Sequence, residues 1–346
     1  MKNMVHTVKG LIPPEQLGKT MTHEHLLWDA SCYAGDEPEE LSFREFIHQD
    51  VGIENLGRVF YNAHKNLDNI KQYSIELATE EVMHYKKVGG KTIVDVTSIG
   101  IGRDPQAILA ISEITGVNIV MGSGYYIEPS HSKQLKSMNK LQIADLLINE
   151  FVNGVKNSSI KPGVIGEIGI STLSNKQEII VLKASAIAQK ETGAPLFIHP
   201  PYGLYAHDLL DIVEKEGGDV SRVVICHCDP ILENVEHLDS IAKRGAYIEY
   251  DQFGLEFPIA AGKGKTIWLP RDIDRIRAIK KQIDLGNLKN ILVSQDVCFK
   301  TSLMKYGGWG YGHILRDLVP YMKEEGICEA ELNKLFVENP KRILTF

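Results

Sequence analysis

The sequence lacks the long apolar runs that place a chain in or across a membrane. No stretch approaches the roughly 20 apolar residues that a membrane-spanning helix needs, and the first six residues do not resemble a signal peptide. Positive charge is not in excess either, since 38 Lys and Arg stand against 45 Asp and Glu and give a formal net charge of −7. We therefore expect a cytoplasmic protein that binds neither nucleic acid nor a membrane.

Cysteine is also scarce. The 346 residues contain five cysteines, an odd number at scattered positions, which argues against a disulfide framework. Cys226 and Cys228 flank His227, and this arrangement fits either a soft metal site or a strand. On a strand, alternation would turn both cysteines away from His227 and into packing, and we favour this interpretation.

Hydrophobic residues make up 43% of the chain, enough for a sizeable core. Short apolar runs alternate with helical patterns, and continuous apolar runs are typical of strands that are covered on both faces. The predicted strands are residues 17–23, 91–97, 117–122, 164–167, 196–199, 223–227, 246–251 and 291–296. The clearest helical patterns cover residues 75–88, 140–155, 176–192, 206–216 and 272–283.

Eight strand–helix units predict one domain over residues 1–346, folded as a (β/α)8 TIM barrel. A doubly wound open sheet is the alternative. The barrel is favoured because candidate ligands follow the first and the eighth strand, which only a closed barrel brings side by side. Residues 29–74 and 252–271 form long connections that we expect at the active mouth.

Six side chains that can bind metal stand at the ends of these apolar runs: His23, His25, Glu167, His199, His227 and Asp296. His23 and His25 are two residues apart, so both imidazoles of a strand would point to one side. Taken singly, each ligand also has a structural interpretation; Asp296, for example, could cap a helix. Their shared position favours a divalent metal site at the mouth of the barrel.

Four imidazoles and two carboxylates suit two divalent ions, with Zn²⁺ expected first and Mn²⁺, Fe²⁺ or Co²⁺ as alternatives. Two such ions about 3.5–4 Å apart can share one water molecule and convert it to hydroxide near neutral pH. The sequence therefore predicts a metal-dependent hydrolase.

The chain resembles the phosphotriesterase family of the amidohydrolase superfamily over nearly its whole length. The motifs that carry the resemblance are Thr22-His-Glu-His25, Gly166-Glu-Ile-Gly-Ile-Ser171, Ile198-His199, His227-Cys-Asp229, Ser294-Gln-Asp296 and Tyr306-Gly-Gly-Trp-Gly-Tyr-Gly312. The resemblance implies a more buried metal on His23, His25 and Asp296. It also implies a more exposed metal on His199 and His227, with position 167 bridging the two.

The bridging position departs from many members of that family, which carry a carbamylated lysine there. Glu167 resembles the branch called phosphotriesterase homology proteins. A glutamate bridges without carbon dioxide, and its presence disfavours efficient hydrolysis of organophosphate triesters.

The resemblance further implies that a metal-bridging hydroxide attacks an ester-like bond while Asp296 transfers the proton to the leaving group. Asp229 would either relay this proton outward or form a local hydrogen bond. Because related enzymes include lactonases, some of them specific for phosphorylated sugar lactones, we expect such a lactone as the substrate. Tyr126, Lys265 and Arg275 are the predicted substrate contacts, with Arg275 pairing to the phosphate.

Two alternatives stay open. The same metals would serve a carboxylesterase, an amidase or a phosphotriesterase, and a protein of this fold would also serve as a non-catalytic metal-binding protein. The expected partner is a small-molecule substrate, and a homodimer is one expected assembly.

Overall fold

The computed structural model describes residues 3–35, 37–156, 158–260 and 266–346. Its centre is an eight-stranded sheet in the order β14-β11-β10-β9-β8-β7-β6-β3, and the neighbouring strands within it are parallel. The strands are β3 (Thr20–Glu24), β6 (Thr92–Asp95), β7 (Asn118–Ser123), β8 (Val164–Gly169), β9 (Leu196–His199), β10 (Val223–Ile225), β11 (Tyr247–Tyr250) and β14 (Ile291–Val293). This order, which follows the chain from end to end, confirms the predicted barrel.

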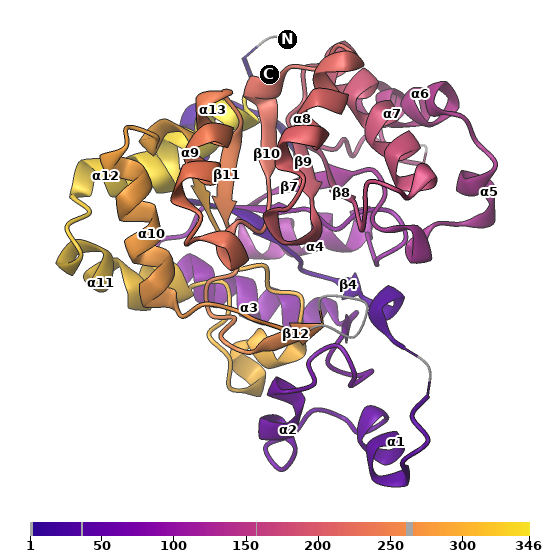
Figure 1. The fold of residues 1–346 in the computed structure, drawn as a ribbon, viewed down its shortest axis with the longest axis vertical. Helices are drawn as coiled ribbons and strands as arrows, with labels where there is room; N and C mark the ends of the chain where they lie inside the picture. Colours follow the sequence, from indigo (N-terminus) through magenta and orange to yellow (C-terminus); the bar gives the residue numbers. More distant parts are fainter. Residues whose placement is uncertain (1–2, 36, 157, 261–265) are drawn as a thin grey trace.

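Helices follow the strands along the chain and cover the outside of the sheet (Figure 1). They are α1 (Leu41–Ile47), α2 (Leu56–Phe60), α3 (Ile75–Lys87), α4 (Pro105–Thr115), α5 (Lys133–Lys136), α6 (Lys140–Asn153), α7 (Lys176–Thr192), α8 (Ala206–Lys215), α9 (Val235–Lys243), α10 (Asp272–Asp284), α11 (Val319–Glu324), α12 (Glu329–Asn333) and α13 (Asn339–Leu344). The five predicted helices are present as α3, α6, α7, α8 and α10. None of the described helices is long and apolar enough to cross a membrane.

Helix α7 shows how local sequence sets the bounds that place a site residue. The Asn175 side chain accepts hydrogen bonds from the backbone N–H groups of Gln177 and Glu178, which starts the helix. Gly193 ends it in the left-handed conformation, with φ 75°. The chain then turns directly into β9, whose last residue is His199.

Side chains alternate between two apolar layers across each strand. In β10, Val224 belongs to the cluster that fills the barrel interior, whereas Val223 and Ile225 belong to the cluster between sheet and helices. Cys226 is buried in the inner cluster and Cys228 in the outer one, so the prediction that both cysteines pack is confirmed. Branched side chains filling the interior are typical of this barrel.

The seam between β3 and β14 is closed mainly through side chains. Ser294 Oγ accepts from the backbone N–H of His23 at 2.9 Å and donates to Glu24 Oε1 at 2.7 Å. The buried Glu24 carboxylate also accepts from the backbone N–H groups of Gln295 and Val297. The first and last strands of the barrel are therefore joined at the level of His23.

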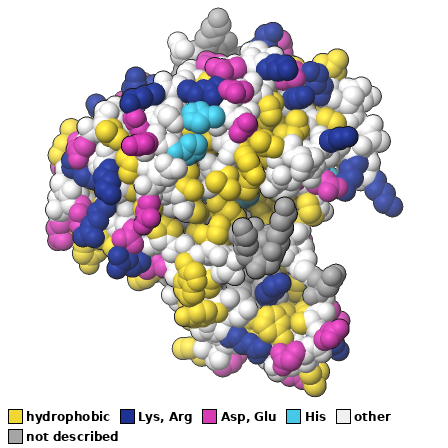
Figure 2. Space-filling view, viewed as in Figure 1, with side chains coloured by type: hydrophobic (Ala, Val, Ile, Leu, Met, Phe, Trp, Pro, Cys, Tyr) yellow, Lys and Arg dark blue, Asp and Glu magenta, His cyan; other side chains and the backbone are white. Residues whose placement is uncertain are grey.

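The two long connections lie at the mouth, as predicted. The first holds α1, α2 and the antiparallel pair β4 (Trp28–Asp29) and β5 (Lys71–Gln72), and its helices form the lobe farthest from the chain termini (Figure 1). The second holds the hairpin of β12 (Pro258–Ala260) and β13 (Thr266–Trp268). Figure 2 shows hydrophobic side chains gathered where this lobe meets the barrel.

We predict that Ser294→Ala lowers the free energy of unfolding by about 1–3 kcal/mol, because it leaves the buried N–H of His23 without its acceptor. Urea unfolding in a fixed metal buffer measures the change. Ser174→Ala is the matched control, since the exposed Ser174 hydroxyl shares a single hydrogen bond, with Thr172, among the described residues, and we expect a change within about 0.5 kcal/mol. Equal stability of the two variants would contradict the proposed role of the seam.

Candidate metal centre

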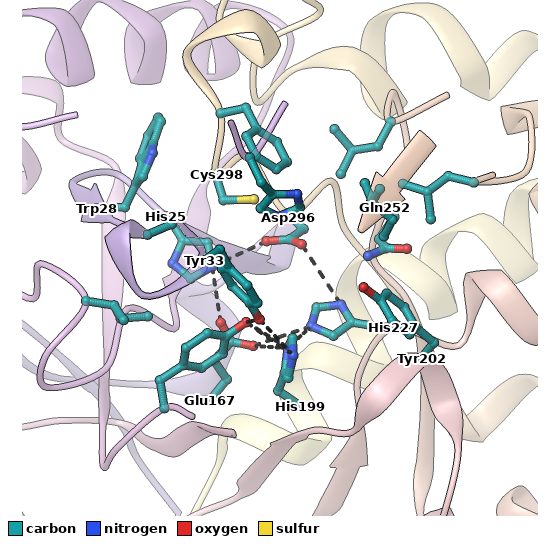
Figure 3. Close-up of a pocket in the computed structure, with 18 residues that line it drawn as sticks. His25, Trp28, Tyr33, Glu167, His199, Tyr202, His227, Gln252, Asp296 and Cys298 are labelled. Atoms are coloured by element: carbon teal, nitrogen blue, oxygen red, sulfur yellow. Dashed lines mark hydrogen bonds and ion pairs between the residues drawn. The ribbon is translucent and has the colours of Figure 1, made fainter. Parts of the chain in front are cut away.

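The structure brings the six predicted metal ligands together at one end of the barrel: His23, His25, Glu167, His199, His227 and Asp296. Each lies within three residues of the carboxyl end of its strand. Figure 3 shows five of them converging on one space from different sides of the barrel.

Glu167 lies in the middle of this cluster. Its Oε1 is 3.4 Å from His25 Nε2, whereas its Oε2 is 3.2 Å from His199 Nδ1 and 3.4 Å from His227 Nε2. Oε2 is also 3.6 Å from His23 Nε2, so this one carboxylate lies close to all four imidazoles. A carboxylate that bridges two ions requires such a central position.

The other carboxylate, Asp296, also lies close to imidazoles of the cluster. Its Oδ1 is 3.3 Å from His25 Nε2 and 3.9 Å from His23 Nε2. Two ligand atoms bound to one tetrahedral ion at 2.0–2.2 Å are about 3.3–3.6 Å apart. Five spacings around the centre lie between 3.2 and 3.6 Å, which is long for a good hydrogen bond, whereas His199 Nδ1 and His227 Nε2 are closer, at 2.6 Å.

The donor atoms themselves favour positive charge at the centre. His23 Nε2 is buried and has no hydrogen-bond partner among the described residues, although it points at Glu167 and Asp296. Burial disfavours a charged His23, yet the carboxylates of Asp251, Glu167 and Glu249 outweigh it and raise the pKa of this imidazole to about 9. Residues that attract a proton so strongly fit a divalent cation, which would also occupy the unpaired nitrogen.

A second layer of carboxylates orients the imidazoles. His227 Nδ1 is 2.9 Å from Asp251 Oδ1, and His23 Nδ1 is 3.2 Å from Glu249 Oε2. Metal-binding histidines usually direct their other ring nitrogen to such a group, which fixes the ring and raises its basicity. Asp251 also accepts from the backbone N–H of His227 at 2.9 Å.

Two of the ligands sit in left-handed backbone conformations, His227 with φ 53° and Asp296 with φ 48°. Such strain in non-glycine residues is found at functional sites, where the surroundings hold it. Here the N–H of Asp296 donates to the carbonyl of His23 at 3.1 Å. Strand β10 ends at Ile225 rather than at the predicted residue 227, and this turn, not strand alternation, directs His227 into the site.

A small pocket of about 80 Å³ opens above the ligands. Tyr126 lies in its wall, where its hydroxyl is 2.7 Å from Tyr33 Oη and 3.1 Å from His199 Nδ1. No lysine or arginine is found among the described residues that line the pocket. Lys265, a predicted substrate contact, lies outside the described residues.

The prediction that Arg275 binds a substrate phosphate is wrong. Its side chain is fully buried in α10 and donates to Asp229 Oδ1 at 2.7 Å, Asp272 Oδ1 at 2.8 Å and the Leu255 carbonyl at 2.8 Å. These partners leave no open side for a phosphate. Asp229 in turn accepts from the backbone N–H of Asp251 at 3.1 Å, which supports the local hydrogen bond rather than the proton relay.

Comparison with known proteins identifies the family. A model of the phosphotriesterase family matches residues 3–344. The chain belongs to the phosphotriesterase family. It is a hydrolytic enzyme, and the enzymes of this family use divalent metal ions.

Three relatives illustrate the likeness. An N-acetyltaurine hydrolase from Homo sapiens is 38% identical, covering 100% of this chain and 99% of that protein. The crystal structure of a resiniferatoxin-binding protein from Rhodobacter sphaeroides has a TM-score of 0.95 and 36% identity, covering 99% and 95% of the two chains. That of a lactonase from Listeria monocytogenes has a TM-score of 0.79 and 27% identity, covering 99% of both.

Sequence reasoning missed several residues of this phosphotriesterase-family site. Glu249 and Asp251 carried a usable signal, because two carboxylates alternate at the end of the seventh strand as His23 and His25 do near the end of the first. His64 carried none, since its place in the pocket depends on how residues 29–74 fold.

We predict that Asp251→Asn weakens divalent metal binding about 10- to 100-fold, since the amide orients His227 less strongly. Competition against a chelator of known affinity measures the change. Asp145→Asn on the exposed face of α6 is the control and should bind metal like the wild type. Wild-type metal affinity in Asp251→Asn would contradict the orienting role.

Proposed function

We propose that this chain is a metal-dependent amidohydrolase that cleaves the amide bond of a small N-acyl compound with an acidic group. N-acetyltaurine is the first candidate substrate. The observation that carries the proposal is the similarity, over the full length of both chains, to the N-acetyltaurine hydrolases.

The pocket favours a small substrate with little negative charge. Its walls are largely aromatic and aliphatic, which suits a short acyl group. Without a lysine or arginine among the described lining residues, a phosphate dianion would have no cationic side chain beside it. A sulfonate or a carboxylate carries only one charge and can be bound by neutral hydrogen-bond donors.

Two divalent ions, with Zn²⁺ expected first, would lower the pKa of a water molecule and polarise the substrate carbonyl. The residues that would hold the ions are His23, His25, Glu167, His199, His227 and Asp296. Glu167 would be shared by both ions, because its carboxylate lies within 3.6 Å of a nitrogen of each of the four imidazoles.

Asp296 would move the proton. It lines the pocket beside His25, so its carboxylate can accept a proton from the attacking water and deliver it to the leaving nitrogen. The delivery matters because an amide nitrogen leaves as a neutral amine rather than as an anion. Tyr126, whose hydroxyl is 3.1 Å from His199 Nδ1, would donate a hydrogen bond to the substrate.

A lactonase is the second candidate, and the similarity to the Listeria monocytogenes lactonase favours it. The same residues would open a lactone ring, with Asp296 protonating the leaving alkoxide. A phosphorylated sugar lactone is a less favoured substrate, because Arg275, the predicted contact for its phosphate, is buried in ion pairs.

A substrate panel tests the proposal. Metal-loaded protein should release taurine from N-acetyltaurine with a kcat/KM at least about tenfold above that for any lactone tested, a difference of roughly 1.4 kcal/mol in transition-state stabilisation. Metal-stripped protein is the control and should release none. Rapid opening of a phosphorylated sugar lactone with no release of taurine would favour the lactonase instead.

Asp296→Asn keeps the size of the side chain but removes its ability to accept a proton. We predict that kcat for the best substrate of the panel falls roughly 10²-fold or more, the contribution typical of a general acid–base. Metal content is measured in the same sample, because Asp296 would also hold an ion. Unchanged turnover at full metal content would contradict the role.

A further inference from the structure

Gln252 lies in the wall of the pocket with its amide group unpaired. The residue directly follows Asp251, is 5% exposed, and lines the pocket. Its Oε1 is buried without a hydrogen-bond partner, and no hydrogen bond among the described residues uses its Nε2. Figure 3 shows the amide turned toward the middle of the pocket, on the side of His227 and Tyr202. The two N–H donors on Nε2 have no acceptor among the described residues, and unused donors on a pocket wall are available to a ligand.

The backbone holds this side chain in place from below. The N–H of Gln252 donates to Asp229 Oδ1, and its carbonyl accepts from the N–H of Leu255 at 3.0 Å. Asp229 is itself fixed by the buried Arg275 at 2.7 Å. The ion pair of Asp229 and Arg275 therefore positions Gln252 through its backbone, and neither side chain of the pair lines the pocket.

Other neutral side chains that can form hydrogen bonds also line the pocket. Tyr33 and Tyr126 bond each other at 2.7 Å and approach His199. His64 lies against Tyr33 and Phe299, and burial lowers its pKa to about 4, so its ring is neutral near neutral pH. The walls thus offer a substrate neutral hydrogen-bonding groups rather than a cation.

We propose that the Gln252 carboxamide determines specificity by donating hydrogen bonds to the acidic group on the amine part of the substrate. The inference rests on the proposed function, since an N-acetyl compound has only its amide and that acidic group to pair. A carboxamide presents two N–H donors, which suit the several acceptor oxygens of a sulfonate or carboxylate. Gln252 is thus a substrate-recognition group and takes no part in proton transfer.

The test compares Gln252→Leu, which keeps the size but removes the hydrogen bonds, with wild type on two substrates. For N-acetyltaurine we expect KM to rise roughly ten- to a hundredfold, the value of a hydrogen bond to a charged group, with kcat changed less than about threefold. For N-ethylacetamide, which lacks the sulfonate, kcat/KM should stay unchanged. Gln134→Leu on α5 is the control and should match wild type on both.

A second variant should reverse the preference for the charge on the amine part of the substrate. Gln252→Glu should lose activity toward N-acetyltaurine further and gain activity toward N-acetylethylenediamine, whose amine tail is positively charged. Equal losses of kcat/KM on charged and uncharged substrates would overturn the proposal, because they would indicate a structural role. A fall in melting temperature of Gln252→Leu would indicate the same, since the substitution removes no side-chain hydrogen bond among the described residues.

Failure of the proposed activity can be told apart from failure of the Gln252 proposal. If wild type hydrolyses no N-acyl compound, the proposed function fails, and Gln252 is judged by calorimetric titration of metal-loaded protein with ethanesulfonate. Weaker binding to Gln252→Leu than to wild type, by about tenfold or more, would support the recognition role. Equal binding, or none to wild type, would overturn it.

Discussion

Four buried carboxyl groups surround the imidazoles at the mouth of the barrel, and this concentration of charge constrains the surrounding structure. They belong to Glu167, Glu249, Asp251 and Asp296. Carboxylates away from water are costly unless positive charge accompanies them. Burial disfavours a charged His25, but Asp296 and Glu167 raise its pKa to about 10. Divalent ions would supply the same compensation, which accounts for the buried carboxylates that surround the imidazoles.

Much of the fold could be predicted because a strand that is covered on both faces must be apolar. Every one of the eight runs became a strand, and the polar residue at each end marked the mouth. The predicted ligands followed from that rule alone, as His199 at the end of β9 illustrates. The predicted strand ends were less accurate at β10 and β14. These strands end before His227 and Asp296, and a left-handed backbone conformation at each of the two residues redirects its side chain.

Residues whose role depends on distant partners could not be predicted in the same way. Arg275 looked like a free cation at the mouth, but its partner Asp229 lies 46 residues earlier, and no local pattern pairs them. The unpaired amide of Gln252 is likewise a property of the folded pocket, because it depends on which hydrogen-bond partners lie nearby among the described residues. Substrate specificity therefore depends on the connections after the first and seventh strands, where sequence periodicity carries least information.

The central claim is that Glu167 lies between two metal ions. Anomalous diffraction from crystals grown with Zn²⁺ tests it most directly. The account predicts two peaks about 3.5–4 Å apart, one beside His23, His25 and Asp296 and the other beside His199 and His227, with the Glu167 carboxylate between them. A single peak, or two peaks with Glu167 bound to neither or to only one, would contradict it.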